Sequence, residues 1–295
     1  MALATSFLLV GACTQDERAE PATDAAPPAT SELMPEPVQE LEIDATEYSF
    51  TISPDPAGGL RAGWTLLKFH NTGDEPHQVM FARIKDGVDM SELAAAGAGD
   101  SSGAGAIEFV DMIGGVSYIG PGQDTTAMVD LSEGLVMAMC YVPDEHGVAH
   151  ALMGMSTSMT VAPADGAASP STGTGEHVVG SIELSEDGYL LPDEMGAGWY
   201  HVVNTDDALH ELSLLRLDGP LDDGGSAQLV DDLAANRPPE VALEAVGGMG
   251  AISAGFDGYL YLDLADGDYL AVDFMPDPGD PRPHMLDGYF GEFSI

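Results

Sequence analysis

The sequence contains few basic residues and almost no cysteine. Of its 295 residues, 8 are Lys or Arg and 50 are Asp or Glu, which gives a formal net charge of −42; the cysteines number 2. A surface this negative repels nucleic acid and anionic lipid, so both are excluded as partners. We interpret the charge as an adaptation to high salt, which screens self-repulsion, in preference to an acidic docking face.

Long apolar runs are absent as well. The start, MALATSFLLVGAC, holds about eleven apolar or small residues, too few to span a bilayer. This segment, residues 1–13, resembles a lipoprotein signal, which implies export and lipidation of Cys13. Residues 14–40 are rich in Pro, Ala and Glu and predict a disordered acidic tether. We expect a periplasmic or cell-surface lipoprotein of a salt-adapted organism that meets the membrane only through a lipid anchor.

The rest of the chain contains its own duplicate. NTGDEPHQVMFARI (71–84) and NTDDALHELSLLRL (204–217) share Asn-Thr, a His six residues after the Asn, and an apolar-rich run. Residues 110–144 match 243–277 in the same register, including a Gly-Gly pair and a final Pro-Asp. Similarity at a constant spacing indicates repeated structural units.

One inserted residue in the following loop shifts this spacing and pairs His150 with His284. We therefore predict two homologous domains, residues 41–162 and 178–295. Between them, residues 163–177 are small and polar, as a linker requires.

Each repeat is expected to consist of short strands. Brief apolar or alternating runs are bounded by Gly, Pro, Asp and Asn, and in the first repeat they are TLLKFHNT, HQVMFARI, TTAMVDL, LVMAMCYV and MTV. Alanine-rich pieces, MSELAAA and AQLVDDLAA, are compatible with helices. The 36 Gly and 20 Pro favour turn-rich β structure. The predicted fold is all-β: two tandem Greek-key β-sandwich domains with short helical insertions.

One unpaired thiol lies among metal-ligand residue types. Residues 140–155 read CYVPDEHGVAHALMGM, so that Cys140 ends an apolar strand, His150 closes the next loop and Met155 precedes the last strand. His77 comes from an earlier strand. Two imidazoles, a thiolate and a thioether form the ligand set of a trigonal copper site with a weak axial Met.

Two other residues in this segment compete as ligands. His146 also follows Cys140 within the loop, but the second repeat has no His at the equivalent position. Met153 competes with Met155 for the axial position, and the Gly-Met pair before the last strand favours Met155.

These motifs resemble the cupredoxins, the family of plastocyanin, azurin, halocyanin and the type 1 site of copper nitrite reductases. The resemblance rests on NTGDEPH and on HALMGM before STSMTV, and it covers nearly all of residues 41–162. It implies one type 1 copper ion bound by four residues: His77, Cys140, His150 and Met155. Gln78 departs from the family, since plastocyanins usually have Asn after the first ligand.

The second repeat keeps both histidines but not the thiol. His210 and His284 remain, whereas Asp273 occupies the position of Cys140 and Tyr289 that of Met155. A blue copper site is excluded there without a thiolate. We interpret this repeat as a vestigial structural domain; the alternative is a harder site for Cu(II), Zn(II) or ferric iron.

Motifs of common catalysts are absent from the sequence. It has no Gly-x-Ser-x-Gly elbow, phosphate loop, Cys-x-x-Cys or His-x-His, and Met139 and Tyr141, not His, flank Cys140. We therefore expect no enzyme but an extracytoplasmic electron carrier that cycles Cu(II)/Cu(I) with redox protein partners. The alternatives are a copper trafficking or resistance protein and a metal-free binding module.

Overall fold

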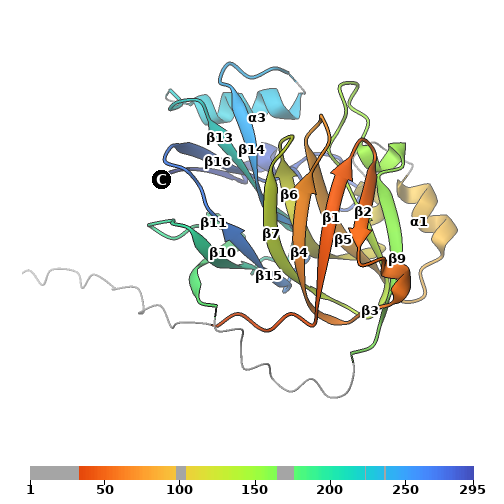
Figure 1. Cartoon of the computed structure of the whole chain (residues 1–295). Helices are drawn as coiled ribbons and strands as arrows, with labels where there is room; N and C mark the ends of the chain where they lie inside the picture. Colours follow the sequence, from red (N-terminus) through yellow and green to blue (C-terminus); the bar gives the residue numbers. More distant parts are fainter. Residues whose placement is uncertain (1–32, 98–103, 165–175, 223, 236) are drawn as a thin grey trace, which may run out of the picture. The chain divides into compact units, whose positions relative to one another are not determined.

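The computed structural model describes residues 33–97, 104–164, 176–222, 224–235 and 237–295. Two β-sheets form a sandwich around a shared apolar core, with one sheet of eight strands and one of nine (Figure 1). The described part of residues 31–295 is a single compact unit. Below, residues 41–162 are called the first repeat and residues 178–295 the second repeat.

The strands and helices have the following bounds. The first repeat contains β1 (Gln39–Thr46), β2 (Ser49–Ser53), β3 (Leu60–Arg61), β4 (Gly63–Asn71), β5 (His77–Ile84), β6 (Val110–Ile119), β7 (Asp124–Leu131), β8 (Gly134–Met139), β9 (Ser156–Ala162), α1 (Met90–Gly97), α2 (Ala104–Ile107) and the 3-10 turns η1 (Pro56–Gly58) and η2 (His150–Met153). The second contains β10 (Val178–Ser185), β11 (Gly188–Leu190), β12 (Gly198–Asn204), β13 (His210–Leu217), β14 (Leu243–Ile252), β15 (Asp257–Leu262), β16 (Asp268–Val272), β17 (Phe290–Ser294), α3 (Gly225–Ala234) and η3 (His284–Asp287).

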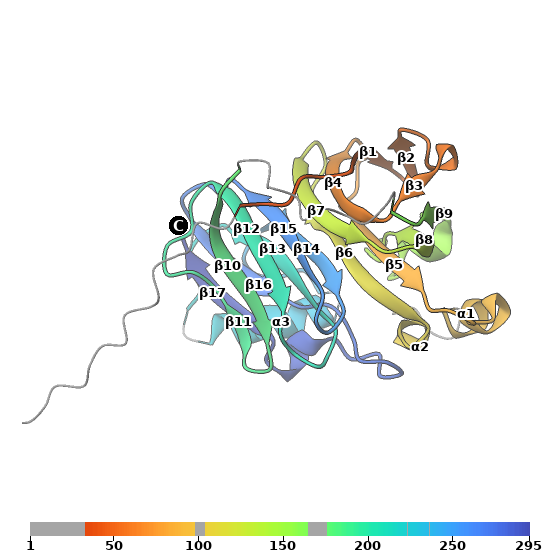
Figure 2. The same ribbon diagram turned by 90° about the horizontal axis from the view of Figure 1, so that it is seen from below.

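Both sheets continue from one repeat into the other. The strand orders are β11-β10-β12-β15-β7-β4-β1-β2 and β17-β16-β13-β14-β6-β5-β8-β9-β3, so that β15 pairs with β7 and β14 with β6 (Figure 2). At these joints, residues at the same repeat position pair antiparallel: Val116 with Met249, and Ala127 with Leu260. Such pairing gives the repeats a local two-fold relation, as in an isologous dimer interface.

Burial follows the apolar pattern of each strand. Residues of β4 alternate between buried and half-buried, as expected for a strand with one face on the core. Most of β5 is buried on both faces, which explains its continuous apolar run. A second cluster of buried residues, which includes Met80, Leu93 and Met112, packs the helices α1 and α2 onto the outer face of β5.

The repeated Gly-Gly pair permits a close backbone approach. Gly115 and Gly248 both have positive φ, of 133° and 134°. A Cβ atom on Gly115 would collide with the carbonyl oxygen of Val79, and one on Gly248 with that of Leu212. Any larger residue would separate β5 from β6 and β13 from β14, so both positions require glycine.

The predicted all-β sandwich with short helical insertions is confirmed. The predicted strand over 135–142 ends at Met139, so Cys140 lies just beyond β8. Residues 1–13 with Cys13, most of the 14–40 tether and most of the 163–177 linker lie outside the described residues. Within the described part of the chain, none of the helices has the length and apolar character needed to cross a membrane.

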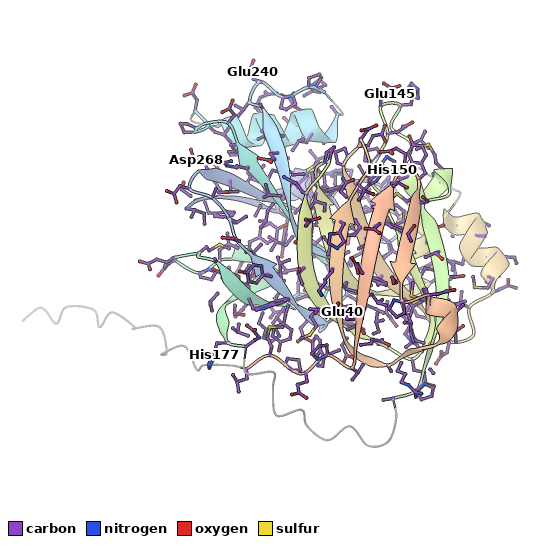
Figure 3. All side chains as sticks on the ribbon, in the orientation of Figure 1. Glu40, Glu145, His150, His177, Glu240 and Asp268 are labelled. Carbon is purple, nitrogen blue, oxygen red and sulfur yellow. The ribbon has the colours of Figure 1, made fainter. Side chains whose placement is uncertain are left out.

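Acidic side chains are distributed over the exterior. Glu40, Glu145 and Glu240 are exposed, whereas His150 is buried (Figure 3). The negative charge therefore lies largely in contact with solvent, where salt screens it. This distribution separates the surface charge from the buried polar groups described next.

Candidate metal centre

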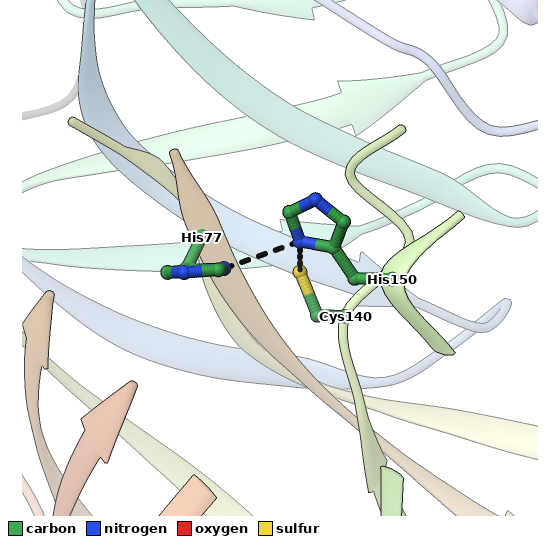
Figure 4. A group of neighbouring side chains, drawn as sticks. All are labelled: His77, Cys140 and His150. Atoms are coloured by element: carbon green, nitrogen blue, oxygen red, sulfur yellow. Dashed lines mark hydrogen bonds between the residues drawn. The ribbon is translucent and has the colours of Figure 1, made fainter. Parts of the chain in front are cut away.

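Three predicted ligands converge in the first repeat (Figure 4). His77 begins β5, Cys140 follows β8, and His150 begins η2. His150 Nδ1 lies 3.5 Å from Cys140 Sγ and 3.2 Å from His77 Nδ1. All three residues have an exposed fraction of 0%. We call this group the first site; its donor atoms are close enough together to contact one metal ion.

The loop before His77 is held by the side chain of Asn71. Its Nδ2 donates to the carbonyl oxygens of Glu75, at 2.8 Å, and Ile119, at 3.1 Å. Its Oδ1 accepts from the backbone N–H of Gly73 at 3.0 Å. The Asn71 amide thus anchors the turn that delivers His77, which gives the repeated Asn-Thr motif a physical role.

The loop from Cys140 to His150 is also held by backbone hydrogen bonds. The N–H of His150 donates to Val142 O at 2.9 Å, and the N–H of Ala151 donates to Cys140 O at 2.7 Å. Inside the loop, Asp144 Oδ1 accepts from the N–H of Val148 at 2.8 Å. These bonds fix the positions of the thiol and the imidazole before any metal binds.

Burial controls the protonation of the first site. It raises the pKa of the Cys140 thiol to about 12, although the N–H groups of Gln78 and Val142 hydrogen-bond the sulfur and partly oppose the rise. Burial also lowers the pKa values of His77 and His150, and for His77 the nearby His150 adds to the effect. At neutral pH the site therefore contains neutral imidazoles and a protonated thiol, unless a bound cation displaces the thiol proton.

Two carboxylates, which the sequence did not single out, lie beside the outer ring nitrogens. Glu75 Oε2 is 3.1 Å from His150 Nε2, and Glu47 Oε1 is 3.6 Å from His77 Nε2. A carboxylate at Nε2 favours the tautomer with its proton there and leaves the Nδ1 lone pair directed inward. Glu75 lies two residues before His77 in NTGDEPH, and this closeness in the sequence could have identified it as a neighbour of the site.

The remaining predicted residues of the first repeat occupy different places. Met155 is fully buried, and its carbonyl oxygen accepts from the N–H of Cys140 at 3.2 Å. The axial role of its sulfur stays a prediction. His146 is exposed on the loop beside Glu145, so it lies apart from the first site. Met153 is half-buried in η2.

The second repeat contains an equivalent cluster, which we call the second site: His210, Asp273 and His284. Asp273 Oδ2 lies 2.7 Å from His210 Nδ1 and 3.0 Å from His284 Nδ1. The hydrogen bonds to Asp273 and its negative charge outweigh burial and raise the pKa of His284. The carboxylate therefore favours a proton, or another cation, on the side of His284 that faces it.

Tyr289 packs beside this cluster. Its ring stacks on that of His210, with centroids 4.0 Å apart and planes at 12°. Tyr289 therefore forms a wall of the second site. The ligand role of its hydroxyl stays a prediction.

Comparison with known proteins gives structural matches only. No protein-family model matches the sequence, and no curated protein does. Auracyanin from Roseiflexus castenholzii is 21% identical and covers 42% of this chain and 97% of its own, with a TM-score of 0.30. The blue copper oxidase of Nitrosomonas europaea is 13% identical over 87% of this chain and 85% of its own (TM-score 0.25). The copper-containing nitrite reductase of Thermus scotoductus is 12% identical over 87% and 61% (TM-score 0.23).

The expectation that the chain is no enzyme is contradicted by these matches. The structures that align over most of the chain are named as an oxidase and a reductase, which are enzymes. The expectation relied on missing motifs, chiefly a His beside Cys140 and a His-x-His pair. Those motifs describe the ligands of one kind of catalytic copper, so their absence could not exclude other catalysis.

Proposed function

We propose that the protein is a copper protein whose first repeat binds one type 1 copper ion and transfers single electrons. The convergence of His77 Nδ1, His150 Nδ1 and Cys140 Sγ in a buried site carries this proposal. Electron transfer at such a centre serves carriers and copper enzymes alike, so the proposal does not oppose catalysis. We also propose that the protein is exported and that it exchanges electrons with a redox protein partner.

The donor set of the first site fits copper. The thiolate of Cys140 suits Cu(I), and neutral imidazoles suit both oxidation states. His77 and His150 are held neutral by burial, so their lone pairs are available at neutral pH. When bound in such a site, copper accepts and donates one electron. Met155, buried and hydrogen-bonded through its backbone to Cys140, is the proposed weak axial ligand.

The chain contributes rigidity and exclusion of water. The Asn71 anchor and the loop hydrogen bonds hold the ligands in place, so a change of charge at the site requires little rearrangement. The N–H groups of Gln78 and Val142 stabilise negative charge on the sulfur of Cys140. Full burial removes water as a competing ligand. These are the conditions for fast electron transfer.

Absorption spectroscopy tests the proposal directly. Full-length protein loaded with Cu(II) should show an intense blue thiolate band that ascorbate bleaches and an oxidant restores. Cys140→Ser should abolish the band while circular dichroism stays unchanged. The matched control His146→Ala, at an exposed position in the same loop, should keep it. A colourless protein that releases Cu(I) to a chelator would instead indicate copper trafficking, and one that binds no copper a metal-free module.

A further inference from the structure

The second site keeps the directional features of the first without its sulfur. Both histidines again direct Nδ1 toward a residue that follows a strand end, here Asp273 after β16. Asn204 repeats the anchor of the preceding loop, since its Nδ2 donates to Ala208 O and Ile252 O, each at 2.8 Å. The scaffold that positions the donors is therefore retained.

Carboxylates outside the second site face the opposite ring nitrogens. Asp206 Oδ2 lies 2.9 Å from His210 Nε2, and Asp277 Oδ1 lies 3.4 Å from His284 Nε2. A carboxylate at the outer nitrogen would hold the ring proton there once a metal ion displaced the proton that the inner nitrogen shares with Asp273, the arrangement typical of metal ligands. His210 Nε2 is hydrogen-bonded to Asp206, whereas Asp277 lies within ion-pair distance of His284 Nε2 without a hydrogen bond.

The spacing of the inner atoms suits a small metal ion. Two donors about 2.1 Å from a common ion, at tetrahedral or octahedral angles, are about 3.0–3.4 Å apart. The observed separations of Asp273 Oδ2 from the two Nδ1 atoms are 2.7 and 3.0 Å. A widening of about 0.3–0.7 Å between Asp273 Oδ2 and His210 Nδ1, and of about 0.4 Å or less between Asp273 Oδ2 and His284 Nδ1, therefore accommodates an ion at zinc-like bond lengths.

The charge of Asp273 also favours a cation at the second site. Asp273 has an exposed fraction of 0%, and its carboxylate faces both imidazoles. Glu211, also buried, adds no charge, because burial raises the pKa of its carboxyl well above the ordinary range. Buried carboxylates are costly unless a counter-charge is present. Protons on the imidazoles supply part of it, and a divalent ion would supply more.

We propose that the second repeat binds one divalent metal ion of borderline character, Zn(II) or Cu(II), through His210 Nδ1, His284 Nδ1 and Asp273. A carboxylate with two imidazoles is a harder donor set than the thiolate site of the first repeat. The chain thus carries two metal centres of different softness on one folded unit. This inference does not depend on copper binding at the first site.

The test uses a full-length chain in which the first site is removed by His77→Ala and Cys140→Ser, together with Cys13→Ser. Calorimetric titration with Zn(II), at high salt and with excess Mg(II) to suppress binding by surface carboxylates, should give one saturable equivalent. Ag(I), a soft probe, should bind the parent protein but not this variant. Cu(II) on the same variant should give a spin-resonance signal with nitrogen couplings from two imidazoles.

Substitutions then locate the ion. On the same background, Asp273→Asn and His284→Ala should each remove the saturable equivalent, while Asp218→Asn, at an exposed position of the second repeat, should leave it unchanged. A background variant that is folded by circular dichroism yet takes up no Zn(II) would overturn the proposal and leave a metal-free ion-pair cluster. Binding that survives both ligand substitutions would overturn it as well.

Discussion

The first and second sites show how one scaffold supports two chemical environments. Asn71 and Asn204 hold the preceding loops by the same side-chain hydrogen bonds, and both later histidines begin a 3-10 turn. The sites differ at two positions, Cys140 against Asp273 and Met155 against Tyr289. The donors and their immediate surroundings therefore differ, while the positions of the backbone groups depend on residues that both repeats share.

The difference between Cys140 and Asp273 changes the distances and the protonation of the rings. In the first site the later histidine lies 3.5 Å from the sulfur, whereas in the second it lies 3.0 Å from a carboxylate oxygen. In the first site burial keeps the thiol protonated and lowers the pKa values of His77 and His150, so both imidazoles favour their neutral form. The carboxylate favours protonated imidazole, and the pKa of His284 is raised. The donor at this position therefore determines both the softness of the site and its charge.

The largest effect is expected when the first site receives the donor of the second. Cys140→Asp should abolish the blue band completely, because no thiolate remains to donate charge to Cu(II). It should also bind two equivalents of Zn(II), one more than Cys140→Ser, because the new carboxylate completes a second site like that of the second repeat. Copper-loaded absorption and calorimetric titration measure both. Cys140→Ser is the control and should lose the band without gaining a Zn(II) site; identical Zn(II) binding by both variants would contradict the comparison.

The reciprocal change should create colour. Asp273→Cys combined with Tyr289→Met gives the second repeat the donors of the first, so the blue absorbance per chain should increase about two-fold. Copper titration followed by absorption measures the increase, and Tyr289→Met alone is the control without a new thiolate. A band of unchanged intensity would show that the two scaffolds differ in more than their donors. Asp206, which lies beside His210 Nε2, would then be the first residue to replace in search of that difference.

The sequence predicted the fold and the composition of the sites better than their surroundings. The 133-residue repeat, seen in NTGDEPH and NTDDALH, places His77 and His210 at the starts of β5 and β13. The joint between the repeats could not be predicted, because the pairing of β6 with β14 depends on edge geometry that no local pattern records. Glu47 was missed for a similar reason: it reaches His77 only through tertiary packing.

Removal of an anchor should have a smaller effect, confined to one repeat. Asn71→Ala leaves the buried carbonyl oxygens of Glu75 and Ile119 without their donor, which should lower the free energy of unfolding by about 1–3 kcal/mol. Since the anchor orients His77, copper affinity should fall by about 10–100-fold. Asn204→Ala is the matched control: it should lose similar stability in denaturant unfolding yet keep the copper affinity of the first site. Equal loss of copper affinity in both variants would contradict separate anchoring.

The smallest effect, opposite in sign between the two sites, is expected from pH in the metal-free protein. Burial lowers the pKa values of His77 and His150 from the ordinary 6.5, so the unfolded chain takes up protons first and the first site loses stability as pH falls below about 6.5. The pKa of His284 is raised from 6.5. Its contribution is therefore fully present below about 6.5 and is lost as pH rises through the folded value.

Because these two trends oppose one another, a melting temperature would partly average them, and the sites must be observed separately. Imidazole NMR signals of chelator-treated protein should show His77 and His150 titrating below 6.5 and His284 above it. Asp273→Asn removes the carboxylate that raises the pKa of His284, so that residue should then titrate lower, as burial alone dictates. If His284 titrates with His77 in the unmodified chain, the carboxylate does not control the second site, and the electrostatic contrast between the repeats is wrong.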